Sequence, residues 1–165
     1  MASLIEELTS TLGEEDKIYE ELIPVEEEKT QILVKNDLEA LSEITKQEQE
    51  IVTKVIQLEK KREGVVNNIA IVLNKDPMTL NIRQIIELLE GQPYQEELKK
   101  VYDSLSKTLE KLIAINNRNK DLIEQSLDIV EFNMNFYKSL QSISINNYNK
   151  GAYDSINNTS QTGMF

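Results

Sequence analysis

Apolar side chains recur at steps of three and four residues along residues 38–73, and this spacing constrains the fold more than any other feature of the chain. We call the helix face marked by this spacing the seam. Eight of its ten positions are apolar; the ten are Leu41, Ile44, Glu48, Ile51, Val55, Leu58, Arg62, Val65, Ile69 and Val72. A period near 3.5 keeps one face of a helix against a partner helix. The pattern therefore predicts a helix roughly 54 Å long that packs lengthwise, with Asp37 as its N-cap.

A similar stripe predicts a first helix over residues 4–35. Its apolar members are Ile5, Leu8, Leu12, Tyr19, Leu22 and Leu33, and the seam is interrupted by Glu15, Glu26 and Lys29. Ser3 and Glu6 have the spacing of a capping box, which predicts the start of this helix. Pro24 removes one intrahelical hydrogen bond, so we expect a kink or a restart, with a bend near Leu22.

The third long helix is predicted over residues 93–142, because Pro93 suits a first helical position and no stop signal follows it. Its seam positions are Leu98, Tyr102, Leu105, Leu109, Leu112, Asn116, Asn119, Ile123, Ser126, Val130, Asn133, Tyr137 and Leu140. At roughly 72 Å it would be about 18 Å longer than the second helix, so its end should overhang. Residues 79–90 predict either a small helix that covers the open end of a hairpin or a loop with a helical turn.

The fold class that follows is all-α. Five Gly and three Pro provide far too few turns for a sandwich or a barrel. We expect an antiparallel bundle of three long, coiled-coil-like helices with one short helix, formed by residues 1–145. Residues 146–165 are polar, almost uncharged and poor in apolar side chains, which predicts a flexible C-terminal tail.

The composition disfavours catalysis. The chain has no His, Cys or Trp, so it lacks an imidazole base, a thiol nucleophile and the usual transition-metal ligands. Glycine-rich phosphate loops and calcium loops are also missing from the sequence. Glu15, Glu26 and Glu48 lie on predicted seams, as in carboxylate-metal bundle enzymes, but without His that ligand set is incomplete. We therefore expect a protein that is not an enzyme and needs no cofactor or metal.

Negative charge is concentrated at the start of the chain. Residues 1–50 hold 15 acidic and 4 basic residues, and the remaining 115 residues hold 14 of each. Such a surface disfavours nucleic acid and anionic lipid; it predicts either a solvated helix face or a docking patch for a basic partner. The first apolar stretch is interrupted by Glu6 and Glu7 and no apolar run is long enough for a membrane span, so we expect a cytoplasmic protein without membrane insertion.

The second half of the third helix is the candidate partner site. Its apolar residues are spread around the helix and comprise Leu127, Ile129, Val130, Phe132, Met134, Phe136, Tyr137 and Leu140. A helix of this kind cannot face water alone. A client protein is the favoured cover, and the alternatives are the chain's own earlier helices or a second copy of the chain. Asn116 and Asn119 either form a polar layer inside the bundle or belong to the client groove.

Several short patterns resemble the FlgN-type flagellar export chaperones. They are Asn36, Asp37, Leu38, Leu41 and Ile44; Leu58, Glu59 and Arg62; Asn116, Asn119, Leu122 and Ile123; and Tyr148 with Gly151. The likeness covers nearly the whole chain. It implies a type III export chaperone for hook-associated proteins of the hook–filament junction.

The resemblance also implies site residues. The client would be bound through Asn116, Asn119, Ile123, Leu127, Val130, Phe132, Met134 and Tyr137. Tyr148 and Gly151 would dock on the export gate, although Asn149, Lys150 and a second aromatic, Tyr153, depart from the family's pattern there. The rival hypothesis is a structural coiled-coil scaffold or self-associating helical subunit, and a homodimer without client is left open.

Overall fold

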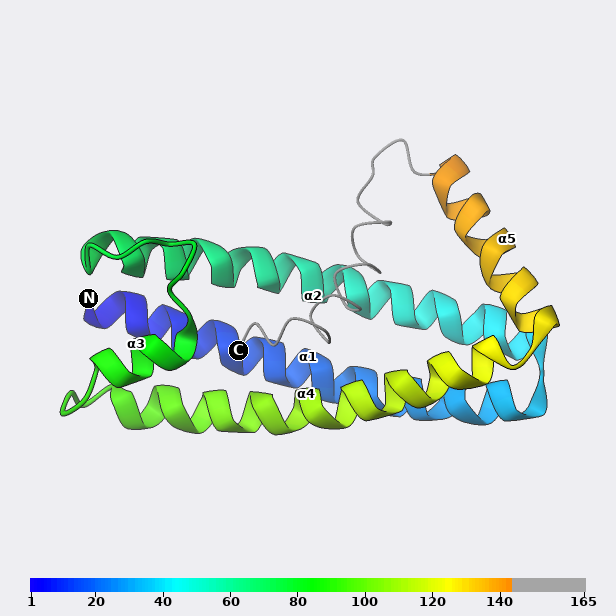
Figure 1. The fold of residues 1–165 in the computed structure, drawn as a ribbon, viewed down its shortest axis with the longest axis horizontal. Helices are drawn as coiled ribbons and strands as arrows, with labels where there is room; N and C mark the ends of the chain where they lie inside the picture. The colour runs from blue at the N-terminus through cyan, green and yellow to red at the C-terminus, as the bar shows by residue number, and fades with distance from the viewer. Residues whose placement is uncertain (144–165) are drawn as a thin grey trace.

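The computed structural model describes residues 1–143, and every regular element in that range is a helix. The helices are α1 (Ala2–Lys35), α2 (Leu38–Val72), α3 (Ile82–Leu88), α4 (Gln95–Glu124) and α5 (Leu127–Ile143). Figure 1 shows α1, α2 and α4 side by side, α3 near one end and α5 at the other end. The predicted all-α class is confirmed.

α1 is the helix that joins the others, because it packs extensively against both α2 and α4. The turn into α2 is tight: Asn36 adopts left-handed angles (φ 55°), and the Asp37 carboxylate accepts a hydrogen bond from the Ala40 amide at 3.1 Å. Asp37 is therefore the N-cap that the sequence predicted. The two helices run antiparallel as a hairpin, whose tip lies at the end of the bundle near α5 (Figure 1).

One expectation for the start of α1 is wrong, and one of the two alternatives for Pro24 is excluded. The helix begins at Ala2 with Met1 as its N-cap and no side-chain cap, so Ser3 lies inside the first turn and forms no capping box with Glu6. Pro24 lies within one uninterrupted helix, so the chain does not restart there. Pro24 is exposed, and the carbonyl that loses its amide partner there can be solvated by water.

α3 closes one end of the bundle, as one of the two alternatives for residues 79–90 predicted. A capping box starts it: Asn81 accepts from the Gln84 amide at 2.9 Å, and the Gln84 side chain accepts from the Asn81 amide at 3.0 Å. Ile82, Ile85 and Ile86 are buried in the larger apolar cluster, which also includes side chains of α1, α2 and α4. The short helix thereby covers side chains that the three long helices leave open.

The buried seam of α2 differs from the predicted one in its middle. Val52 and Glu59 are buried, whereas Ile51 and Leu58 are only half-buried, and Val72 is exposed. A straight α-helix has 3.6 residues per turn, so a strict seven-residue pattern drifts around its surface. The core follows this drift and takes the residues one position further along.

The predicted continuous helix over residues 93–142 is also wrong. The chain leaves the helical pattern at Gln125 and Ser126, and α5 begins at Leu127 in a different direction. In Figure 1, α5 turns away from the bundle axis beside the hairpin tip instead of prolonging α4. The expected overhang is replaced by a separate helix that contacts the bundle mainly near its own start.

Candidate functional site

α5 carries apolar side chains on two different faces. Residues three and four apart share a face of a helix, which divides the apolar residues of α5 into two stripes. The inner stripe consists of Ile129, Phe132, Phe136 and Leu140. The outer stripe consists of Leu127, Val130, Met134 and Tyr137. A third face is polar and includes Asp128, Glu131, Asn135 and Lys138.

The inner stripe attaches α5 to the hairpin tip. Ile129 is 1% exposed and packs into a small apolar cluster with Leu33, Leu41 and Ile44, which come from the end of α1 and the start of α2. Phe132 packs against the edge of this cluster and stacks on Phe136, with ring centroids 6.2 Å apart. Beyond Ile129 the inner stripe is only half-buried, because α5 diverges from α2 (Figure 1).

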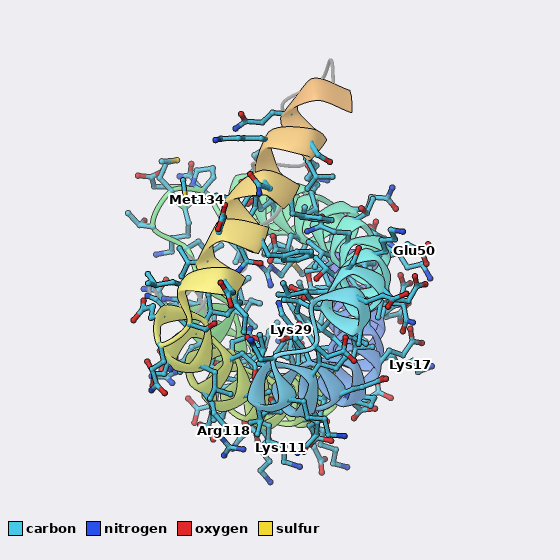
Figure 2. All side chains as sticks on the ribbon, turned by 90° about the vertical axis from the view of Figure 1, so that its right-hand side faces the viewer. Lys17, Lys29, Glu50, Lys111, Arg118 and Met134 are labelled. Atoms are coloured by element: carbon cyan, nitrogen blue, oxygen red, sulfur yellow. The ribbon has the colours of Figure 1, made fainter. Side chains whose placement is uncertain are left out.

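The outer stripe has little cover. Leu127 is 89% exposed and Met134 is 55% exposed, while Val130 and Tyr137 are half-buried. Figure 2 looks along the bundle and shows Met134 on the side of α5 away from α2. The spacing of three, four and three residues is that of a coiled-coil seam. A seam of this kind has the geometry to receive another helix.

The structure separates the residues that the sequence grouped as one client site. Leu127, Val130, Met134 and Tyr137 share the outer stripe. Phe132 lies on the inner stripe, and Ile123 packs partly against the hairpin-tip cluster. Asn116 is half-buried on α4, whereas Asn119 is buried in the bundle interior. Tyr148 and Gly151 lie outside the described residues.

Asn119 belongs to a buried polar layer between the two apolar clusters. Its Nδ2 donates to the Glu26 carbonyl and to Glu26 Oε2, both at 3.1 Å, and its Oδ1 accepts from the Thr30 hydroxyl. In the same layer Lys29 Nζ donates to Glu48 Oε2 at 2.7 Å, and both side chains are about 5% exposed. Figure 2 shows Lys29 pointing inward between the helices, in contrast to Lys111 at the periphery. This arrangement matches the polar-layer alternative for Asn119.

The polar layer around Asn119 contains the carboxyl groups of Glu26 and Glu48 and the ammonium group of Lys29. Full ionisation would therefore leave this layer with a net negative charge. Burial raises the pKa of Glu26 to about 7, and the negative charge of Glu48 acts in the same direction. The positive charge of Lys29 and a hydrogen bond from Asn119 oppose the rise. One proton on this layer therefore balances its charge near neutral pH.

A second polar layer also contains two carboxyl groups, those of Glu15 and Glu59, and one basic group, that of Arg62. Arg62 Nη1 donates to Glu15 Oε2 at 2.9 Å, and the Tyr19 hydroxyl donates to Glu59 Oε1 at 3.3 Å. Glu15 Oε1 is buried without a hydrogen-bond partner within the described residues. Burial raises the pKa of Glu15 to about 7 despite the opposing charge of Arg62, and burial also raises the pKa of Tyr19. The charged residues on the sequence seams were the signal for both layers.

Neither layer resembles a metal site. Within residues 1–143 no three carboxyl groups gather in a way that could hold a metal ion. Each buried carboxyl pair is instead associated with a basic side chain, which supplies the positive charge. A separate property of the same range is that none of its helices combines the length and apolar character needed to span a bilayer.

Comparison with known proteins identifies one family. The family model described as FlgN protein matches residues 1–154, nearly the whole chain. No curated protein and no solved structure matches the sequence. Because the match covers both hairpin helices, α4, α5 and the residues that carry the patterns of the suspected family, this chain belongs to the FlgN family.

Proposed function

We propose that this protein is a cytoplasmic chaperone of flagellar type III export that binds hook–filament junction proteins before their secretion. Membership of the FlgN family supports the chaperone role. The observation that carries the binding proposal is the outer stripe of α5, which is apolar, spaced like a coiled-coil seam and exposed at Leu127 and Met134. The client would dock on this stripe as an amphipathic helix.

The outer stripe is large enough for a useful affinity. Fully burying an aliphatic or aromatic side chain contributes roughly 1.5–3 kcal/mol relative to leaving it exposed. Leu127 and Met134 are the most exposed of the four, so they would gain most from a partner. Loss of translational freedom and side-chain ordering offset part of this gain, so a dissociation constant in the micromolar range is a reasonable expectation.

The proposal predicts that Val130→Asp combined with Tyr137→Asp abolishes binding of a purified junction protein from the same bacterium. Two carboxylates in the middle of the docked seam would be desolvated without partners, at a cost of several kcal/mol. Isothermal titration calorimetry measures the binding, and circular dichroism should show unchanged helix content. Asn135→Asp with Ser139→Asp is the matched control, because it adds the same charge to the polar face of α5.

Light scattering on the same proteins tests the rival scaffold function. It should give a monomer that forms a one-to-one complex with the junction protein. Unchanged binding by the double variant would refute the outer stripe as the client site, and a constant oligomer that ignores the junction protein would favour the scaffold. Tyr148 and Gly151 are proposed as the export-gate contact only because they match positions of the family's pattern; a Tyr148→Ala variant that still supports export would refute that assignment.

A further inference from the structure

The break between α4 and α5 contains no residue that forbids a helix. Residues 124–127 are Glu, Gln, Ser and Leu, all of which are tolerated inside helices, and neither Pro nor Gly is present. Gln125 keeps right-handed helical angles (φ −81°, ψ −10°), and no residue near the break has a positive φ. The seam of α4 also continues in register through Ile123, Ser126, Val130 and Tyr137. One uninterrupted helix is therefore locally possible, although Ser126 also caps the start of α5 by accepting a hydrogen bond from the Ile129 amide at 3.4 Å.

Contacts with the hairpin tip hold α5 in its bent position. Ile129 is the residue of α5 that is fully buried, and its neighbours Leu33, Leu41 and Ile44 belong to α1 and α2. The Ser126 hydroxyl donates to Asn36 Oδ1 at 3.2 Å, which ties the break to the turn of the hairpin. This bond is exposed and contributes little. Burial of Ile129 and packing of Phe132 are therefore the tertiary contacts that hold α5 in this direction, in addition to the cap that Ser126 provides at the start of α5.

We infer that the hairpin tip is a second docking surface for the client, and that it opens when α4 and α5 join into one straight helix. In the structure Ile129 and Phe132 cover the tip, so α5 occupies it in place of a partner. Straightening withdraws both side chains and uncovers Leu33, Leu41 and Ile44. This inference rests on the proposed function, since the partner is the same client that docks on the outer stripe.

The chemistry of the tip defines the segment that would fit it. α5 itself covers the hairpin tip with an aliphatic and an aromatic side chain three residues apart, Ile129 and Phe132. Asp37, Glu39 and Glu43 are exposed around the tip and outnumber the exposed Lys35 and Lys46, so its surroundings carry a small net negative charge. The matching client segment is therefore an amphipathic helix with such an apolar pair and with Lys or Arg beside it. Its other apolar face would meet the outer stripe of the straightened helix.

Neighbouring substitutions on α5 should act in opposite directions. Ile129→Ala weakens the contact that holds α5 against the tip, so it should tighten binding of the junction protein by roughly tenfold, because more of the free protein is already open. Val130→Ala removes part of the outer stripe and should weaken binding several-fold. Adding Leu41→Ala to Ile129→Ala should cancel the gain, because it removes part of the tip surface. Calorimetric titration of the three variants measures these effects.

A second measurement follows the rearrangement directly. The chain has no native Cys, so spin labels at Lys46→Cys on α2 and Lys138→Cys on α5 would be the sole labelled sites. Both side chains are exposed. Joining α4 and α5 should lengthen the distance between the labels by on the order of 10 Å, given the 1.5 Å rise per residue. The shift should occur with Ile129→Ala alone and with wild type after addition of the junction protein.

The outcomes separate this inference from the proposed function. Weaker or unchanged binding with Ile129→Ala, while Val130→Ala still weakens binding, would overturn the tip as a docking surface and leave the outer stripe in place. A wild-type protein that binds no junction protein would refute the proposed function. In that case the label distances decide the rearrangement by themselves, and a distribution in Ile129→Ala identical to wild type would overturn it.

Discussion

Replacing Arg62 by methionine should destabilise the protein by about 3–5 kcal/mol at pH 8, the usual cost of removing one partner of a buried ion pair. The substitution leaves Glu15 and Glu59 buried without the guanidinium group that compensates their charge. Folded domains have only about 5–15 kcal/mol of net stability, so the urea midpoint should fall severely. Urea denaturation followed by circular dichroism measures the effect.

Lys61→Met is the matched control for this prediction. Lys61 is adjacent to Arg62 on α2 and pairs with Glu14 at 3.4 Å, but both of these side chains are more than 40% exposed. An exposed pair contributes at most about 1 kcal/mol, so Lys61→Met should be nearly neutral. Equal losses for the two substitutions would show that the buried guanidinium has no special role in stability.

The protein should also become more stable as the pH falls from 8.5 to 5.5. The pKa values of Glu15 and Glu26 are raised to about 7 in the fold, compared with 4.5 for an ordinary glutamic acid. Folding therefore takes up protons in this interval, and the folded state gains stability as the pH falls through 7. Linkage gives about 2 kcal/mol for each group between these pH values. Urea denaturation at pH 5.5, 7.0 and 8.5 measures the free energy of unfolding.

The variant with Glu15→Gln and Glu26→Gln identifies the groups responsible. Neither glutamine titrates, so the free energy of unfolding should lose most of its dependence on pH over this interval. The variant should also approach, at pH 8.5, the stability that the wild type reaches at pH 5.5, because each polar layer then carries a balanced charge. A wild-type protein that gains stability as the pH rises from 5.5 to 8.5 would contradict the assignment.

The helices themselves could be predicted because their signals are local. Seam spacing located α2 to within one residue, and Asp37 marked its start correctly. A short helix before residue 90 was one of the two alternatives for that segment, and its capping residues are Asn81 and Gln84. Such features depend on neighbours within one or two turns, so they can be inferred without knowledge of the fold.

The break at Ser126 was not predicted, although the sequence holds one local signal for it. Ser126 caps α5 by accepting a hydrogen bond from the Ile129 amide at 3.4 Å, and Asp128 lies in the first turn. The direction of α5 depends on a contact between distant residues, the burial of Ile129 beside Leu33 and Leu41. The start of α1 shows the opposite error: Ser3 and Glu6 fit a local motif, yet the helix extends past them to Ala2. Local spacing does not decide between two arrangements when tertiary packing favours one of them.

The sequence predicted a client site in the second half of the third helix, but the sequence alone could not assign the faces of that segment. Leu127 and Phe132 have similar apolar character, and only the position of the hairpin tip shows that the first faces outward and the second inward. Asn119 was compatible with either a groove or the interior until its bonds to Glu26 and Thr30 were known. The assignment of client contacts remains a prediction to be tested on the outer stripe.

The polar layer around Lys29 divides the molecule into two parts of unequal robustness. The larger apolar cluster is shared by α1 to α4, whereas the smaller one joins the hairpin tip to α5 and to the end of α4. Amide hydrogens near Ile129 and Leu41 should therefore exchange with solvent through local openings, far sooner than those near Leu8 or Leu105. A molecule built this way can open at the hairpin tip while the remainder of the bundle stays folded.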